Sequence, residues 1–130
     1  LLFEKEKICV KEGIDLECDI TIYDTGCISK NHLCSIFSNL MDNAINECKS
    51  LNEADKKIKV TAAQKNGFIS VRCENTAKGD KHRIIRPSES KGYGMKILQD
   101  IANRYKGRYK CEINEGKCLS EITVNILKQE

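Results

Sequence analysis

Residues 39–45, Asn39-Leu40-Met41-Asp42-Asn43-Ala44-Ile45, lie in the middle of a long helical pattern in this chain of 130 residues. Apolar side chains recur around them at helical spacing, behind Ser29, which is a favourable N-cap residue. The apolar stripe comprises Leu33, Ile36, Phe37, Leu40, Met41, Ala44, Ile45 and Cys48. The pattern predicts a helix of about five turns that begins after Ser29 and buries one face.

Three asparagines, Asn39, Asn43 and Asn46, share one edge of this predicted helix. Successive helical residues are about 100° apart, so the three carboxamides fall within a sector of roughly 60° beside the apolar stripe. Amide oxygens are hard, neutral ligands that suit a Mg²⁺ whose other positions are filled by phosphate and water. The same residues also fit the solvated border of an amphipathic helix, although asparagine in a helix interior lowers helix stability.

Patterns typical of strands lie on both sides of the helix. Residues 14–22 alternate apolar with polar side chains, which predicts a first strand with one buried face. Residues 58–65 and 68–74 predict two strands joined at Asn66-Gly67, a dipeptide strongly associated with two-residue hairpins. Residues 1–12 are charged and compatible with a helix that Gly13 would end.

The second half of the chain predicts a loop, a helix and a hairpin. Residues 75–91 are polar, contain the only proline and show no sustained period, so a long surface loop is expected. A second amphipathic helix follows Gly92-x-Gly94 and ends at Gly107. Residues 108–114 and 118–127 then predict a closing hairpin. The order predicts an α+β two-layer sandwich, a mixed sheet of about five strands with helices on one face.

The composition fits a single domain. A hydrophobic fraction of 40% supplies one core. Lysine and arginine number 22 against 19 acidic residues, and a net charge of +3 is too small to indicate a nucleic-acid-binding protein. No run of about 18 apolar residues is present, so the sequence predicts neither a membrane span nor a signal peptide.

Eight cysteines are spread along the chain at positions 9, 18, 27, 34, 48, 73, 111 and 118, with no Cys-x-x-Cys pair. This spacing argues against a zinc site. Cys34, Cys48 and Cys73 fall where an apolar residue would serve, and reduced cysteine packs as a small hydrophobe, so we expect a cytosolic compartment. A disulfide framework is the alternative, because the number of cysteines is even and the chain is short.

Residues 39–45 resemble the N-box of the GHKL ATPase superfamily, which contains histidine kinases, gyrase-type ATPases and heat-shock chaperones. This resemblance implies the Bergerat ATP-binding fold and ATP as the ligand. In the superfamily the N-box asparagines coordinate a Mg²⁺ that is bound to the ATP phosphates. The matching residues are Asn39 and Asn43, which we therefore expect to bind both the metal and the nucleotide.

A second motif of the superfamily, Asp-x-Gly-x-Gly, corresponds to Asn75-Thr76-Ala77-Lys78-Gly79, where only the last glycine matches. In the family the aspartate accepts a hydrogen bond from the adenine amino group, and the glycines admit the base. Asn75 keeps a carbonyl oxygen that accepts such a bond, although the charge is lost. The resemblance makes Asn75, Ala77 and Gly79 candidate nucleotide-binding residues, with a methyl group added at Ala77.

A third motif, Lys91-Gly92-Tyr93-Gly94-Met95, resembles the Gly-x-Gly-Leu box that ends the ATP lid, and all five residues are candidates for nucleotide binding. Glycines let the backbone approach phosphate, and the amides and dipole of a helix start attract it. A flexible loop before a helix, with no role in binding, would show the same Gly-x-Gly pattern. Residues 80–90 match the basic lid, and Ser120 corresponds to a threonine near the adenine in histidine kinases.

The order of the motifs resembles the catalytic domain of bacterial sensor histidine kinases, with residues 14–130 as that domain and residues 1–13 as the end of a preceding helix or a linker. The motif Asn-Ala-Ile-x-x-Cys and the asparagine at position 75 are most similar to the corresponding sequences of kinases that receive peptide pheromones in Gram-positive bacteria. This similarity implies a part in quorum sensing.

The resemblance implies an ATP-dependent protein-histidine kinase that needs partners outside this chain. His32 and His82 lie on a helix start and in the lid, so the γ-phosphate would go to a histidine on a separate dimerisation helix. The phosphate would then pass to a response regulator. The signal would arrive through a membrane sensor upstream of Leu1, which makes this chain the cytoplasmic domain of a membrane-bound receptor. No catalytic residue is identified.

Two other functions fit the sequence. An anti-sigma-factor kinase of the same fold phosphorylates serine and needs no dimerisation helix, but the helix-like residues 1–12 argue against it. A degenerate interaction module without nucleotide is favoured by the altered second motif and disfavoured by the surviving asparagines and glycines.

Overall fold

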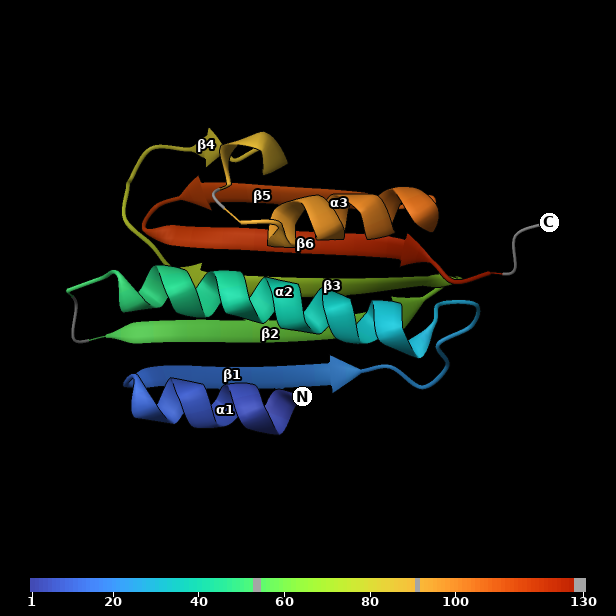
Figure 1. Ribbon diagram of the computed structural model, residues 1–130, viewed down its shortest axis with the longest axis horizontal. Helices are drawn as coiled ribbons and strands as arrows, with labels where there is room; N and C mark the ends of the chain where they lie inside the picture. The colour runs from blue at the N-terminus through green and yellow to red at the C-terminus, as the bar shows by residue number, and fades with distance from the viewer. Residues whose placement is uncertain (53–54, 91, 128–130) are drawn as a thin grey trace.

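Three helices lie on one face of a six-stranded sheet in the computed structural model, which describes residues 1–52, 55–90 and 92–127 (Figure 1). The helices are α1 (Leu2–Lys11), α2 (Lys30–Lys49) and α3 (Gly94–Arg104). The strands are β1 (Ile14–Thr21), β2 (Lys56–Lys65), β3 (Phe68–Thr76), β4 (Arg83–Ile84), β5 (Arg108–Asn114) and β6 (Lys117–Asn125). The predicted two-layer α+β sandwich is confirmed.

The sheet is mixed, with the strand order β1-β2-β3-β6-β5-β4. Strands β1 and β2 are parallel, and every other neighbouring pair is antiparallel. Helix α2 connects the parallel pair, because parallel neighbours need a crossover. Asn66 and Gly67 at the turn between β2 and β3 both have positive φ, 52° and 81°, which confirms the predicted two-residue hairpin.

Three of the predicted helix ends are confirmed. Ser29 is the N-cap of α2, and its Oγ accepts a hydrogen bond from the His32 amide at 3.1 Å. Gly13 follows α1 with φ 69°, the left-handed conformation that commonly ends a helix. Helix α3 begins at Gly94, as the Gly-x-Gly pattern predicts.

The main hydrophobic core lies between α2 and the sheet. Seven residues of the predicted apolar stripe are buried, and Leu33 is partly buried. Ile36 and Met41 of α2 pack in the same core as Val60 and Ile122 of the sheet. Burying each such side chain contributes roughly 1.5–3 kcal/mol, so this core holds α2 on the sheet. A second, smaller cluster at the start of α3 comprises Ala77, Met95, Cys111, Ile113 and Cys118.

Helix α1 packs on β1 and contacts α2. Cys9 is buried in the main core, and Lys5 forms an ion pair with Asp42 of α2. Lys49 and Glu12 lie 3.9 Å apart at the other end of the two helices. The continuation of residues 1–13 into a longer helix stays a prediction. Within the described residues, none of the helices has the length and apolar character that crossing a membrane requires.

The prediction of about five strands and an open loop at residues 75–91 is wrong in one respect. That segment contains a sixth strand, β4, which pairs with β5, and a short 3₁₀ helix at Pro87–Glu89. A strand of two residues is too short to show a period of two, so no local pattern reveals it. Only the pairing with β5, which follows much later in the chain, creates this strand.

Several apolar positions are more exposed than their patterns indicate. Strand β1 lies at the sheet edge, and only Ile14 of its apolar side chains is buried. Cys34 of α2 and Ile97 of α3 are exposed. All eight cysteines lie among the described residues and are free thiols, and Cys48 and Cys73 are buried as predicted.

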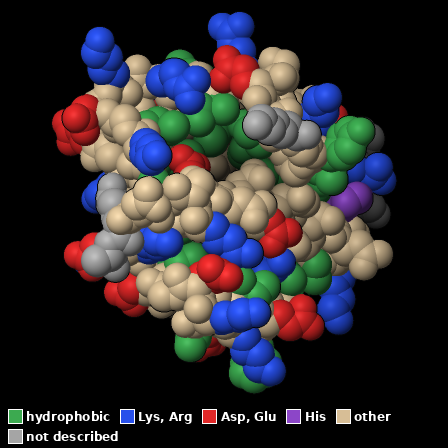
Figure 2. Space-filling model, turned by 60° about the vertical axis from the view of Figure 1, so that its left-hand side comes forward, with side chains coloured by type: hydrophobic (Ala, Val, Ile, Leu, Met, Phe, Trp, Pro, Cys, Tyr) green, Lys and Arg blue, Asp and Glu red, His purple; other side chains and the backbone are tan. Residues whose placement is uncertain are grey.

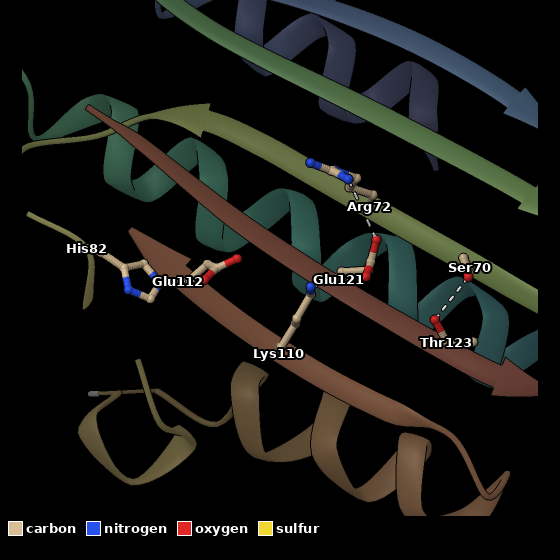
Figure 3. A network of polar contacts seen from close by, with 7 residues as sticks. All are labelled: Ser70, Arg72, His82, Lys110, Glu112, Glu121 and Thr123. Carbon is tan, nitrogen blue, oxygen red and sulfur yellow. Dashed lines mark hydrogen bonds and ion pairs between the residues drawn. The ribbon is translucent and has the colours of Figure 1, made fainter. Parts of the chain in front are cut away.

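The face of the sheet opposite the helices carries polar side chains (Figure 3). Glu121 of β6 lies between Arg72 of β3 and Lys110 of β5, at 4.0 Å and 3.8 Å. Ser70 and Thr123 share a hydrogen bond of 2.9 Å. Exposed ion pairs of this kind add little stability, but they suit a face that stays in contact with water.

Gly107 connects α3 to β5 at a point where the chain passes the backbone of β6. A Cβ added at Gly107 would lie 1.7 Å from the carbonyl oxygen of Thr123, a distance that no side chain accommodates. We expect Gly107→Ala to lower the free energy of unfolding by at least about 2 kcal/mol, because the backbone would have to move. Urea unfolding followed by circular dichroism measures this change.

Gly92→Ala is the matched control, because nothing lies within 4 Å of a Cβ added there. It should change the free energy of unfolding by no more than about 1 kcal/mol. Equal destabilisation by the two substitutions would contradict the close packing of Gly107 on β6.

Candidate functional site

A pocket of about 190 Å³ opens at the end of the molecule where β3 ends and α3 begins. It lies between the asparagine edge of α2, the start of α3, the segment that carries β4, and strands β3, β5 and β6. Its lining residues are Asn43, Asn46, Glu47, Asn75, Ile85, Ser90, Met95, Cys111, Cys118 and Ser120. Figure 2 shows this end of the molecule, where hydrophobic side chains gather around a hollow in the upper half.

The start of α3 lies against the asparagines of α2. A Cβ added at Gly94 would lie 3.1 Å from Asn39 Oδ1 and 3.4 Å from Asn43 Oδ1. Asn39 donates its Nδ2 to the Ser35 carbonyl at 2.8 Å, so its oxygen is the atom left to face Gly94. Two amide oxygens therefore meet the first residue of a helix, where free N–H groups carry partial positive charge.

Asn75 and Ser120 are polar residues buried in the pocket, with exposed fractions of 4% and 6%. Asn75 Nδ2 donates to the Thr76 carbonyl at 2.9 Å, and no described residue donates to its Oδ1. Ser120 Oγ donates to Cys111 Sγ at 3.3 Å. Asn75 Oδ1 is not among the buried atoms that lack a partner, so it is open to the pocket and available to a donor on a ligand.

The segment between β3 and α3 covers one side of the pocket through Ile85 and Ser90. The Ile85 amide donates to the Cys111 carbonyl at 2.8 Å, which ties the segment to β5. His82 Nε2 lies 2.7 Å from Glu112 Oε2, as Figure 3 shows for the two side chains. The hydrogen bond with His82 lowers the pKa of Glu112.

Three basic side chains project from this covering segment. Lys81, Arg83 and Arg86 are exposed, and none of them forms an ion pair within the part of the chain that the structure describes. Their charge is therefore available to an anion that enters the pocket beneath the segment.

The sequence profile of the GHKL domain family matches residues 29–125, from the N-cap of α2 to the end of β6. The chain belongs to this family. The predicted resemblance to the GHKL superfamily is thereby confirmed. A comparison with curated proteins found no match.

Solved structures with a similar fold include several histidine kinases. The nucleotide-free catalytic domain of ThkA has a TM-score of 0.74 and 20% identity over 98% of this chain and 88% of that chain. AdeS from Acinetobacter baumannii has a TM-score of 0.73 and 17% identity over 98% of this chain and 61% of its own. ShkA, solved at full length in complex with AMPPNP, has a TM-score of 0.70 and 12% identity over 98% of this chain and 28% of its own. This GHKL domain thus spans less than two thirds of AdeS.

Some of the predicted site residues are brought together and some are not. Those that line the pocket are Asn43, Asn75, Met95 and Ser120. Asn39 and Gly94 lie next to Asn43, against each other. Residues from all three predicted motifs therefore meet at one end of the sheet.

The other predicted residues lie outside the pocket lining. Ala77 is buried in the second core cluster, and the Gly79 carbonyl accepts a hydrogen bond from the Gly116 amide at 2.8 Å. Gly92 borders open space, and the exposed Tyr93 ring lies under the ammonium group of Lys96. Lys91, also a predicted site residue, lies outside the described residues.

Sequence patterns do not single out Cys111, Cys118, Ile85 or Ser90 as pocket residues. Cys111 and Cys118 alternate with exposed residues on β5 and β6, and that pattern indicates the helix-covered face but not the pocket. Ile85 and Ser90 reach the pocket only because β4 pairs with β5. Asn46 also lines the pocket, and the sequence contains a signal for it, because Asn46 shares a helix edge with Asn43.

Asn39 and Asn43 fit a Mg²⁺ that an anionic ligand also binds. Their oxygens are hard but neutral, and the described residues contain no group of three or more His, Cys, Asp or Glu side chains placed to hold a metal ion. Asp42, between them in the sequence, pairs with Lys5 of α1. The donor set therefore suits a metal shared with phosphate better than a metal held by protein alone.

The burial of Asn75 predicts a cost for restoring a charge there. We expect Asn75→Asp to lower the free energy of unfolding by about 1–3 kcal/mol at neutral pH, because a buried carboxylate would face the Thr76 carbonyl without a donor. The loss should disappear at acid pH, since a protonated carboxyl group donates to that carbonyl again. Chemical unfolding at several pH values measures both effects.

Asn114→Asp makes the same change of charge at an exposed position and serves as the control. It should change the free energy of unfolding by no more than about 0.5 kcal/mol. If Asn75→Asp is equally harmless at neutral pH, the side chain of residue 75 is not buried as described.

Proposed function

We propose that this GHKL domain binds Mg·ATP in the pocket and serves as the catalytic domain of a sensor histidine kinase. The position of Gly94 against Asn39 and Asn43 supports this most directly. A close backbone, a helix start and hard oxygen ligands are the features that phosphate and its metal require, and here they come together.

The adenine would lie in the inner part of the pocket. Ile85 and Met95 supply apolar walls that suit a flat aromatic base. Asn75 Oδ1 would accept the hydrogen bond of the adenine amino group, because Asn75 Nδ2 is already bound to Thr76. Asn75 thus offers a hydrogen-bond acceptor, as the family's aspartate does, but it carries no negative charge.

The triphosphate would extend from the base towards the start of α3. Asn39 and Asn43 would hold Mg²⁺ together with the phosphates, and the metal would neutralise part of their charge. The exposed Arg83 and Arg86 of the covering segment would add further positive charge. The work of this domain is therefore positioning and charge neutralisation.

The phosphoacceptor would be a histidine outside this chain. His32 is hydrogen bonded to Tyr105 and His82 to Glu112, so both histidines have structural contacts in the domain. AdeS and ThkA are histidine kinases, and ShkA was solved with AMPPNP, which supports transfer of phosphate from ATP to a dimerisation helix. From there it would pass to a response regulator.

The same proposal extends to the parent protein. The sequence motif at residues 43–48 and the asparagine at position 75 support a receptor for a peptide pheromone, with this domain on the cytoplasmic side of a membrane-bound kinase. The domain alone would bind nucleotide but transfer no phosphate.

Calorimetric titration of ATP into the domain, with and without Mg²⁺, tests the nucleotide site. We expect binding that depends on Mg²⁺ and that Asn43→Ala weakens at least about tenfold, because the substitution removes an oxygen ligand. Asn103→Ala, on the exposed side of α3, is the control and should leave the affinity unchanged. A folded wild type that binds no ATP at several millimolar would overturn the proposal and favour the nucleotide-free interaction module.

A further inference from the structure

Cys111 of β5 and Cys118 of β6 form a pair of thiols in the lining of the pocket. Their sulfur atoms are 3.7 Å apart, and the two residues are 5% and 4% exposed. In the strand register Cys111 faces Ser120 and Cys118 faces Ile113, so the two cysteines are diagonal neighbours on adjacent strands. The nucleotide site described above makes no use of either thiol.

We propose that this pair is a modification site for small hydroperoxides, at which Cys111 is oxidised first and Cys118 then closes a disulfide in the pocket. Hydrogen peroxide is small compared with the pocket of about 190 Å³, and both cysteines belong to the lining of that pocket. The oxidation itself does not depend on nucleotide binding, whereas its consequence for ATP rests on the proposed function.

The hydrogen bonds around the pair distinguish the two sulfurs. Cys111 Sγ accepts a hydrogen bond from Ser120 Oγ and shares one with Cys118 Sγ, in which Ser120 leaves the Cys118 thiol as the favoured donor. These bonds, that of Cys118 first, lower the pKa of Cys111 to about 7 against the opposing effect of burial. The pKa of Cys118 is raised because its thiol is the donor. Cys111 is thus the nucleophile and Cys118 the resolving thiol.

The two steps balance in atoms and electrons. The Cys111 thiolate attacks one oxygen of hydrogen peroxide, an S–O bond forms, the O–O bond breaks, and hydroxide leaves to give a sulfenic acid. Cys118 sulfur then attacks the Cys111 sulfur, an S–S bond forms, the S–O bond breaks, and water leaves with the thiol proton. Two thiols are oxidised and one peroxide is reduced to two molecules of water or their ions.

Closing the disulfide changes the pocket. The sulfur atoms must approach from 3.7 Å to about 2.05 Å, which shifts the lining of β5 and β6 and alters the Cys111 sulfur to which Ser120 donates. Ser120 and Asn75 lie in the same lining. We therefore expect the oxidised domain to bind ATP at least about threefold more weakly than the reduced domain.

Mapping of disulfides after brief exposure to hydrogen peroxide tests the site. The exposed Cys18, Cys27 and Cys34 are first replaced by serine to prevent bonds between molecules. Trypsin cleaves after Lys110 and Lys117, so the two cysteines fall on separate peptides that only a disulfide joins. We expect the linked peptide to form at least about tenfold faster than any oxidation of Cys73, whose pKa burial raises to about 12.

Two single variants identify the order of events. In Cys118→Ser the Cys111 sulfenic acid should accumulate and react with dimedone, and in Cys111→Ser Cys118 should react no faster than Cys73. Circular dichroism checks that both variants fold, and the peptide mapping of the parent protein does not depend on them. If Cys111 and Cys118 are oxidised no faster than Cys73, the site is overturned.

ATP titration of the reduced and oxidised protein separates this proposal from the proposed function. A linked peptide without ATP binding in the reduced protein would leave the thiol site standing and overturn the nucleotide site. ATP binding without a linked peptide would support the nucleotide site and overturn the thiol site. A disulfide that leaves ATP affinity unchanged would overturn the effect on the pocket.

Discussion

Gly94 comes so close to Asn39 and Asn43 that a side chain there would crowd the Asn39 oxygen and touch the Asn43 amide, and this contact constrains the rest of the domain. It requires α2 and α3 to lie side by side on the same face of the sheet, with the start of α3 at the asparagine edge of α2. The main core under α2 meets that requirement, because its apolar stripe allows one rotation of the helix about its axis. The asparagines then have to face α3.

The far end of α3 is held by a second set of contacts. The Tyr105 hydroxyl accepts a hydrogen bond from the Ser29 amide and shares one with His32 Nδ1, so the last turn of α3 is tied to the first turn of α2. Gly107 then brings the chain against β6 without space for a side chain. With both ends of α3 fixed, the free N–H groups at its start point towards one end of the sheet, where the pocket lies.

At the pocket, polar residues interrupt the apolar packing of the domain. Buried polar residues, Asn75 and Ser120, stand among apolar side chains, and the Asn75 oxygen accepts nothing from the described residues. The Asn75 oxygen is open to the pocket, where a donor on a ligand would pair with it. The small core cluster at the start of α3 meets the main core at the partly buried Tyr109, and the pocket lining includes Asn43 and Asn46 of α2.

Much of the fold could be predicted because its signals are local. Ser29 caps a helix with its own side chain, Asn66 and Gly67 adopt positive φ within a single turn, and the stripe from Leu33 to Cys48 repeats at a helical period. The candidate site was partly predictable for the same reason, since Asn39 and Asn43 share a helix edge. Strand β4 and the exposure of Cys34 were not, because both depend on what lies opposite in space.

The amino-acid sequence by itself determined the helices, the hairpins and the motifs of a GHKL domain, since each rests on residues close together in the chain. Only the tertiary structure decided which of those residues meet. It placed Gly94 against Asn39 and Asn43, left Ala77 and Gly92 out of the pocket lining, and set Cys111 beside Cys118. The physical reason is that pairing between strands and packing between helices join residues far apart in the chain, and no local period records those distances.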